Sequence, residues 1–267
     1  MISYQSSIFP LWDNDPPFGR GEVLKMPTFE VFLPTCHDKD GAVIVIHGGG
    51  YAFSAEHEGA PVAKRFAQEG ITAFVLNYRF SPSVHPAPLA DLYRALRLIR
   101  SKAHIFGIDP TKIALAGFSA GGHLAACAAT LFEQYTFNKE DSLSDIPNRP
   151  DALILSYPVI SSGEFAHHGS FEALLGHHNS ADLRKELSLE HRVNKNTPPT
   201  FIWHTADDST VPVENSLLFA NALWKANVDC SLHVFPKGTH GLGLANEDPY
   251  VSCWFEMARK WLGVRGY

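Results

Sequence analysis

Cysteine is scarce and scattered in this 267-residue chain, and no two cysteines form the CxxC pair that brings thiolates onto one metal or redox centre. We therefore expect reduced thiols at Cys36, Cys127, Cys230 and Cys253. No stretch approaches the roughly 18 consecutive apolar residues that a membrane span requires. Residues 1–10 hold no Lys or Arg and no sustained apolar run, so they lack both parts of a secretory signal. On these grounds we expect a cytoplasmic protein with no membrane partner.

A surplus of positive charge is also missing. The formal net charge is −6, from 22 Lys and Arg against 28 Asp and Glu, without long runs of one sign. Such a chain offers no basic stripe to a phosphate backbone, so nucleic acid is not an expected partner. Hydrophobic residues make up 45% and charged residues 19%, which is typical of globular proteins. At this length we expect a single domain over residues 1–267, and a homo-oligomer stays open.

Short apolar runs alternate along the chain with segments that carry apolar residues at helical spacing. Runs that are apolar on both faces are typical of strands buried on both sides of a sheet. The expected strands are 28–33, 42–46, 72–77, 112–116, 152–156, 200–204 and 231–235, and the expected helices are 59–69, 89–105, 119–130, 215–227 and 251–262. Because strand and helix alternate, the pattern predicts an α/β fold with a mostly parallel, doubly wound sheet and helices on both faces.

A Gly-x-Ser-x-Gly motif stands at residues 117–121, directly after an expected strand and directly before an Ala-rich expected helix. This context is typical of a nucleophile elbow and makes Ser119 the candidate nucleophile. The elbow is a strained turn in which a side chain at a flanking position would clash, which gives glycine at 117 and 121 a steric reason. The motif also occurs by chance in glycine-rich loops, but such matches seldom fall between a buried strand and a helix.

A second glycine-rich motif, His-Gly-Gly-Gly-Tyr at residues 47–51, follows the expected strand 42–46. Glycines at the end of an early strand let backbone N–H groups point at an oxyanion. We expect the amides of Gly49 and Gly50 to form an oxyanion hole together with the amide of Ala120. Taken alone, the motif also fits a flexible turn without a role, and the elbow downstream favours the oxyanion hole.

The acid and the base of such a site are expected later in the chain, each in a loop after a strand. The expected strand 200–204 leads to two adjacent carboxylates, Asp207 and Asp208, of which one can orient a histidine. The expected strand 231–235 leads to a Gly-flanked loop that carries His240, the expected general base. The competing histidines lie within expected strands or in the elbow helix, where a structural role is expected; they are His123, His204 and His233.

Three segments break the alternation of strand and helix. Residues 1–22 are rich in Pro, Gly and aromatic side chains and predict an irregular arm over the body, whereas residues 132–150 are polar with two prolines. Residues 161–198 predict an insertion over the active site. Four histidines in this insertion suggest a metal site, but no acidic or cysteine ligand completes a known spacing, so we expect a solvated loop and no metal; they are His167, His168, His177 and His178.

Several motifs together, at residues 47–51, 77–79, 86–92, 117–124 and 238–241, resemble the acetyl esterase branch of the α/β-hydrolase superfamily. The resemblance covers nearly the whole chain and is greatest to small bacterial esterases grouped with acetyl xylan esterases and bifunctional acetyl and feruloyl carbohydrate esterases. In related hydrolases the acid stands three residues before the Val of a Val-Pro pair, which selects Asp208 here. Thr205 is a departure, because many relatives have Gly after the strand histidine.

The resemblance implies a serine esterase with Ser119, Asp208 and His240 as its triad and with no cofactor. It further implies that the enzyme removes acetyl groups from short acetylated xylo-oligosaccharides, a small-molecule ester substrate. The same motifs occur in general short-chain carboxylesterases and in arylformamidases, so both stay open as alternatives. A non-enzymatic binding protein on this fold typically loses the histidine, and a peptidase usually needs a further domain. Tyr157 is expected either to line the acyl pocket or to be a plain core residue.

Overall fold

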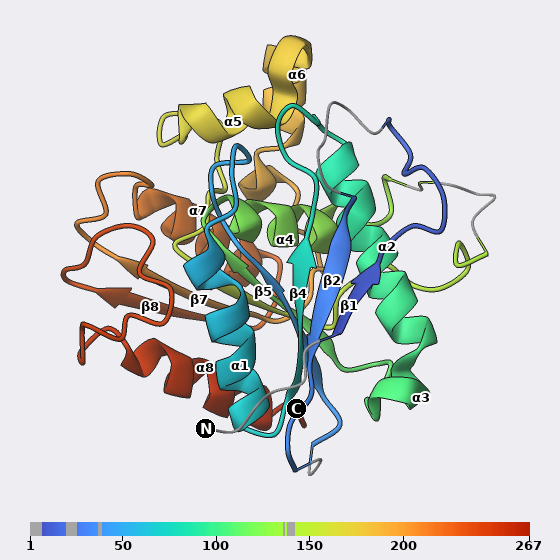
Figure 1. The fold of residues 1–267 in the computed structure, drawn as a ribbon. Helices are drawn as coiled ribbons and strands as arrows, with labels where there is room; N and C mark the ends of the chain where they lie inside the picture. The colour runs from blue at the N-terminus through green and yellow to red at the C-terminus, as the bar shows by residue number, and fades with distance from the viewer. Residues whose placement is uncertain (1–6, 20–25, 37–38, 136, 138–141) are drawn as a thin grey trace.

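The computed structural model describes residues 7–19, 26–36, 39–135, 137 and 142–267. An eight-stranded sheet runs through the molecule in the order β1-β2-β4-β3-β5-β6-β7-β8 (Figure 1). β1 and β2 pair antiparallel, and the strands from β3 to β8 run parallel to one another. The strands are β1 (Ser7–Pro10), β2 (Thr28–Phe32), β3 (Ala42–Ile46), β4 (Thr72–Asn77), β5 (Ile113–Phe118), β6 (Ala152–Ser156), β7 (Thr200–Thr205) and β8 (Cys230–Phe235). The predicted mostly parallel sheet is confirmed.

Each face of the sheet has its own hydrophobic core, because side chains alternate along a strand. In β3, Ile44 and Ile46 face one core, whereas Val43 and Val45 face the other, and all four are fully buried. Helices contribute to both cores, as the sequence pattern predicts (Figure 1). The first core is covered by α2 (Ala87–Ser101), α3 (Ala103–Phe106), α4 (Ala120–Thr130) and α7 (Glu214–Lys225), and the second by α1 (Ala60–Gln68) and α8 (Cys253–Gly263).

One expected helix is divided in the structure. The sequence predicts a single helix over 89–105, but α2 ends at Ser101 and α3 begins at Ala103, with Lys102 between them outside helical geometry. No Gly or Pro stands at the break, so the usual sequence signals of a helix end are absent there. Gly107 then ends α3 in the left-handed conformation, with a φ of 65°.

The expected irregular arm contains a strand, so that prediction is wrong for part of it. Ser7–Pro10 forms β1 and pairs with β2 at the edge of the sheet. All four residues are exposed, which leaves no alternation of burial to detect in the sequence, and Pro10 is tolerated because this is an edge strand. Residues 11–19 contain no helix or strand. Residues 1–6 and 20–22 of the expected arm lie outside the described residues.

A buried ion pair holds this arm against the body. Asp91 in α2 accepts hydrogen bonds from Nε and Nη2 of Arg79, both at 2.8 Å, and both side chains are shielded from solvent. Trp12 donates from Nε1 to Asp91 at 2.9 Å. Arg79 Nη1 donates to the carbonyls of Pro17 and Gly19, each at 2.8 Å. A charge pair with this many partners stays buried without an orphaned group.

The 161–198 segment forms short helices rather than the solvated loop expected for its histidines. They are α5 (His168–Leu175), η2 (Gly176–His178), α6 (Ala181–Glu186) and η3 (Leu189–His191). Figure 1 shows α5 and α6 at the top of the molecule, beyond the end toward which β4 points. His168, His177 and His178 are exposed, whereas His167 is half-buried because it caps α5.

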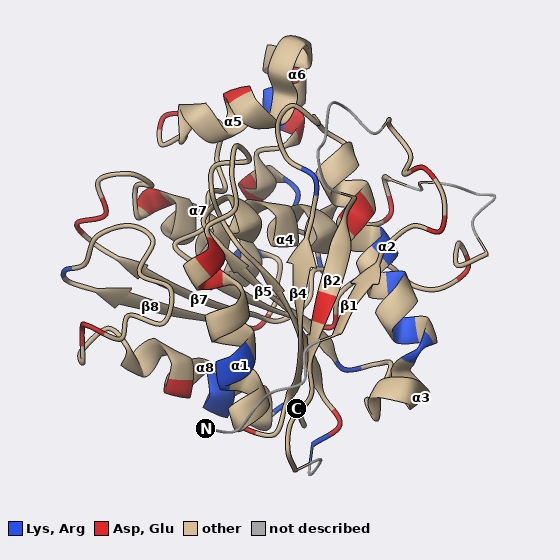
Figure 2. Cartoon of the chain, in the orientation of Figure 1, with Lys and Arg blue, Asp and Glu red and all other residues tan. Residues whose placement is uncertain are grey.

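Figure 2 shows basic residues along α2 and α1 in this view, with acidic residues distributed around them. The α2 arginines are turned into the protein, because each donates to a backbone carbonyl at 3.0 Å or less. The donors are Arg94, Arg97 and Arg100, and the acceptors belong to Leu11, Ile146 and Arg149. Among the described residues, no helix is both long enough and apolar enough to cross a bilayer.

Candidate active site

Ser119 stands between β5 and α4 in a strained turn. Its φ of 51° and ψ of −118° lie in a region that residues with a side chain rarely adopt. The Ser119 N–H donates to the Ser156 carbonyl at 3.0 Å, and its own carbonyl accepts from the Val159 N–H at 3.1 Å. The end of the neighbouring strand β6 therefore holds the turn in place.

The two glycines of the elbow have no room for a side chain, as the sequence analysis expects. A Cβ on Gly117 would lie 2.5 Å from the Gly121 carbonyl oxygen, and one on Gly121 would lie 2.2 Å from the Ile46 oxygen. Both contacts are with backbone atoms, which have little freedom to move away. The elbow thus depends on close packing between β5, α4 and the end of β3.

Ser119, His240 and Asp208 form a hydrogen-bonded line. Nε2 of His240 lies 2.8 Å from Ser119 Oγ, and Nδ1 of His240 lies 2.6 Å from Asp208 Oδ2. The serine follows β5, the aspartate follows β7 and the histidine follows β8. Because the carboxyl ends of parallel strands meet at one edge of a sheet, these three loops come together there.

The Asp208 carboxylate is arranged to stay ionised. Burial alone would raise its pKa, but hydrogen bonds from His204, His240 and the Val211 N–H outweigh burial and hold the pKa of Asp208 below its usual range. An ionised Asp208 makes Nδ1 of His240 the donor. The other ring nitrogen of His240, Nε2, is then free to accept the proton of Ser119.

Asp207, the alternative acid, has a different partner. Its side chain is exposed, and Oδ1 accepts a hydrogen bond from the Gly238 N–H at 2.7 Å. Asp207 therefore holds the backbone of the loop that carries His240, while Asp208 holds the imidazole itself. The two carboxylates therefore hold different points of the same loop.

The three competing histidines are engaged within the fold. His123 and His204 are fully buried, and His233 lies in β8 against an aromatic ring. Their partners are Tyr51 and Leu187 for His123, Ser216 and Val211 for His204, and Phe201 for His233. Only His204 approaches the hydrogen-bonded line among these three, with Nε2 3.3 Å from Asp208 Oδ2.

The glycine-rich loop at 47–51 packs directly against the elbow. A Cβ on Gly48 would lie 2.9 Å from Ser119 Cβ, and Gly49 has a φ of +117°, where a Cβ would meet the Phe53 carbonyl at 2.0 Å. Among the described residues, no protein acceptor takes the N–H groups of Gly49, Gly50 and Ala120. These three amides therefore have no competing protein acceptor in the described part of the chain, and the loop that carries two of them packs against Ser119.

Two residues that stabilise the site carry no signal in the sequence pattern. Thr205, where the resemblance leads one to expect Gly, donates from Oγ1 to the Gly238 carbonyl at 2.7 Å and so ties β7 to the His240 loop. Glu58 belongs to a short polar stretch of the sequence, yet its side chain is only 2% exposed. Its carboxylate accepts from the Gly48 N–H at 2.8 Å and from the Tyr157 hydroxyl at 2.7 Å.

Ser170 and His167, the residue that caps its helix, place the 161–198 segment beside the glycine-rich loop. Its Nδ1 accepts from the Ser170 N–H at 3.3 Å and lies 2.8 Å from Ser170 Oγ. With Nδ1 an acceptor, the ring proton of neutral His167 sits on Nε2, which is a donor. Burial lowers the pKa of His167, nearby His240 lowers it further, and Asp208 opposes both. Ser170 Oγ also lies 3.8 Å from the point that a Cβ on Gly50 would occupy.

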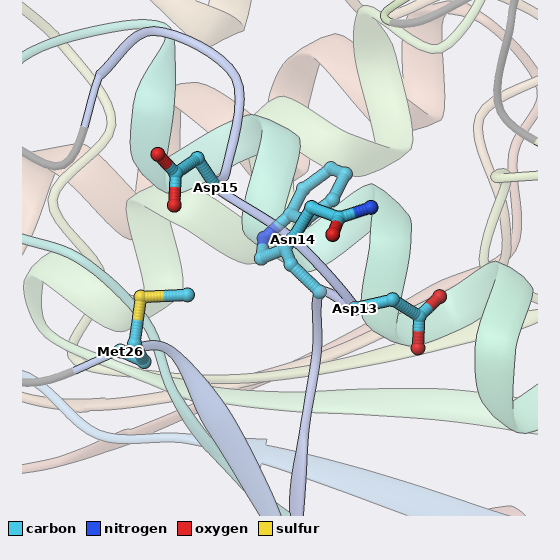
Figure 3. Close-up of a pocket in the computed structure, with 5 residues that line it drawn as sticks. Asp13, Asn14, Asp15 and Met26 are labelled. Atoms are coloured by element: carbon cyan, nitrogen blue, oxygen red, sulfur yellow. The ribbon is translucent and has the colours of Figure 1, made fainter.

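A separate hollow of about 660 Å³ opens at the arm, lined by Trp12, Asp13, Asn14, Asp15 and Met26 (Figure 3). It shares no residue with the site at Ser119. Asp13 points away from Met26 in this view. Its Oδ2 lies 3.3 Å from Nη2 of Arg94. In the described part of the chain, no three His, Cys, Asp or Glu side chains gather as metal ligands.

Solved structures are similar to this protein over nearly its whole length. The acetyl ester-xyloside bifunctional hydrolase of Caldicellulosiruptor lactoaceticus is 45% identical, with a TM-score of 0.93 over 99% of this chain and 98% of that structure. MGS-M1, an α/β-hydrolase enzyme from a deep-sea metagenome library of the Medee basin, is 29% identical, with a TM-score of 0.72 over 97% and 96%. The fold is therefore the α/β-hydrolase fold.

Two sequence relatives are longer proteins. Endo-1,4-beta-xylanase B of Butyrivibrio fibrisolvens is 42% identical over 86% of this chain and 36% of its own length. Acetylxylan esterase of Xylanibacter ruminicola is 32% identical over 86% of this chain and 47% of its own length. The chain thus spans less than half of either relative. The BD-FAE family model matches residues 29–223, and with these similarities the chain belongs to the BD-FAE family.

Proposed function

We propose that the chain is a serine carboxylic ester hydrolase in which Ser119 is the nucleophile, His240 the general base and Asp208 the orienting acid. The observation that carries this proposal is the hydrogen-bonded line from Ser119 through His240 to Asp208, with distances of 2.8 and 2.6 Å. No other serine among the described residues combines a strained elbow with a hydrogen bond to a carboxylate-bound histidine.

The proposed reaction proceeds through an acyl-enzyme. His240 Nε2 takes the Ser119 hydroxyl proton as Oγ attacks the ester carbonyl, and the oxygen that becomes negative is held by the amides of Gly49, Gly50 and Ala120. Each such donor is worth roughly 3 kcal/mol of barrier. His240 then gives its proton to the departing alcohol, after which a water molecule, activated in the same way, releases the acid and restores Ser119.

The proposed substrates are short acetylated xylo-oligosaccharides. This part rests on the relatives, of which one is named an acetylxylan esterase and another an acetyl ester-xyloside hydrolase. It also rests on the 161–198 segment, to which we assign the sugar, because its residue His167 carries a ring N–H at Nε2 and its residue Ser170 has Oγ 3.8 Å from the point that a Cβ on Gly50 would occupy. Binding energy from the sugar would then orient the ester for attack.

An ester panel tests the proposal. We expect turnover of aryl acetates and of acetylated xylo-oligosaccharides, with efficiency falling steeply for acyl chains beyond about four carbons, because sugar binding rather than a long acyl pocket supplies the orientation. A feruloyl ester and an aryl formamide belong in the same panel. Preference for octanoate would favour a general carboxylesterase, and preference for the formamide would favour an arylformamidase.

A further inference from the structure

The buried carboxylate of Glu58 contacts the glycine-rich loop. Glu58 is the last residue of η1 (Glu56–Glu58), and its Oε2 accepts from the Gly48 N–H at 2.8 Å. Gly48 immediately precedes the amides assigned to the oxyanion. Burial raises the pKa of Glu58, and the hydrogen bonds from Tyr157 and Gly48 offset only part of that rise. A carboxylate kept this far from solvent is costly unless its oxygens are hydrogen-bonded, as both oxygens of Glu58 are.

The other oxygen of Glu58 is held by Tyr157, which reaches the histidine loop. The Tyr157 hydroxyl donates to Glu58 Oε1 at 2.7 Å and accepts from the Gly243 N–H at 2.8 Å. The tyrosine ring is 1% exposed, and its centroid lies 5.0 Å from that of the His240 ring in an edge-on arrangement. Tyr157 therefore packs against the His240 imidazole and fixes the backbone at Gly243, three residues after His240.

Gly48, Glu58, Tyr157 and Gly243 form a series of hydrogen bonds. The two N–H groups at its ends determine the direction of each bond when Glu58 is ionised. The N–H groups of Gly48 and Gly243 are donors only, so the Tyr157 oxygen accepts from one and the carboxylate accepts from the other. The Tyr157 hydroxyl proton must then point at Glu58. A group that accepts on both sides is needed between Gly48 and Tyr157, and an ionised carboxylate meets that need whereas an amide does not.

A second contact joins η1 to the loop that carries His240. His57, the neighbour of Glu58, places Nε2 2.8 Å from the Gly241 carbonyl. The η1 segment thus reaches the backbone on one side of the oxyanion and on the far side of His240.

We propose that Glu58 and Tyr157 are positioning residues. They hold the glycine-rich loop at 47–51 and the loop that carries His240 in the relative position that catalysis requires. The proposal rests on the esterase function proposed for Ser119. Because the two residues act through Gly48 and His240 rather than on the substrate, their loss should lower kcat and leave KM for a small ester nearly unchanged.

The test compares kcat, KM and the thermal unfolding midpoint for Tyr157→Phe, Glu58→Gln and the double variant on an aryl acetate. We expect each single variant to lose roughly ten- to a hundred-fold in kcat, the size of one hydrogen bond to a charged group that matters in the transition state. The double variant should lose no more than the worse single variant, because both break the same chain of hydrogen bonds.

Tyr93→Phe is the matched control, since Tyr93 is a buried tyrosine whose hydroxyl has no partner among the described residues. It should keep wild-type kcat. Unchanged kcat in Tyr157→Phe, losses that multiply in the double variant, or a fall in kcat that merely follows a fall in the unfolding midpoint would each overturn the proposal. Ser119→Ala in the same assay distinguishes failure of the positioning proposal from failure of the proposed function, because activity in that variant would overturn the esterase assignment itself.

Discussion

Asp207 and Asp208 are neighbours in the chain and hold two different points of one loop. Asp208 Oδ2 lies 2.6 Å from the His240 ring, and Asp207 Oδ1 accepts from the Gly238 N–H at 2.7 Å. The first contact fixes the tautomer of the base, whereas the second fixes only the backbone before it. Loss of the Asp208 carboxylate therefore removes the partner of the His240 ring, whereas loss of the Asp207 carboxylate removes only a backbone contact of the loop.

This difference predicts unequal effects of two similar substitutions. Asp208→Asn should lower kcat by about four orders of magnitude, because an amide presents a donor to Nδ1 and favours the wrong tautomer of His240. Asp207→Asn keeps an oxygen acceptor for Gly238 and should cost only a few fold. Steady-state kinetics on an aryl acetate measures both. The opposite ranking would make Asp207 the acid.

A second prediction concerns the nucleophile. Ser119→Ala should abolish ester hydrolysis, because no other group of the site is placed to form the acyl-enzyme. Its unfolding midpoint should stay close to that of the wild type, because the backbone hydrogen bonds of the elbow to Ser156 and Val159 do not use the side chain. Retention of a tenth of wild-type turnover would refute the assignment of Ser119.

Much of this site is predictable from sequence because its candidate catalytic residues lie in short motifs of neighbouring residues. Glycines at 117 and 121 are required by contacts with backbone atoms nearby, so they appear as a fixed spacing around Ser119. The loop carrying His240 likewise follows from strand order, since parallel strands end at one edge of the sheet. Residue type, spacing and fold class therefore all predict the same place for Ser119 and His240 in the fold.

The remainder depends on contacts between distant parts of the chain. Glu58 and Tyr157 are 99 residues apart, and no local pattern marks a glutamate in a polar stretch as buried. β1 escapes prediction because it is a four-residue strand at the sheet edge with every residue exposed, so no alternation of burial marks it in the sequence. Thr205 reaches Gly238 only after β7 and β8 have paired.

A third prediction concerns stability, at the ion pair of Arg79 and Asp91. Asp91→Asn should lower the free energy of unfolding by about 3–5 kcal/mol, because it leaves a buried guanidinium without its counter-charge. Asp13→Asn is the matched control: the Asp13 side chain is 89% exposed and pairs with Arg94 at 3.3 Å. Because the Asp13 carboxylate lies in water, the loss of its charge should cost about 0–1 kcal/mol. Urea unfolding of both variants measures the difference, and equal losses would contradict the prediction.

The last prediction tests whether the 161–198 segment recognises the sugar. His167→Ala should lower kcat/KM on acetylated xylo-oligosaccharides by roughly tenfold, the value of one hydrogen bond, because the Nε2 donor that His167 offers is lost. An aryl acetate has no sugar hydroxyl to receive that bond, so its kcat/KM should stay near the wild-type value. His178→Ala, an exposed histidine of the same segment, serves as the control on both substrates. A wider alanine block over the segment should enlarge the same difference. If both activities fall in parallel in His167→Ala, the segment supports the general site and the carbohydrate assignment fails.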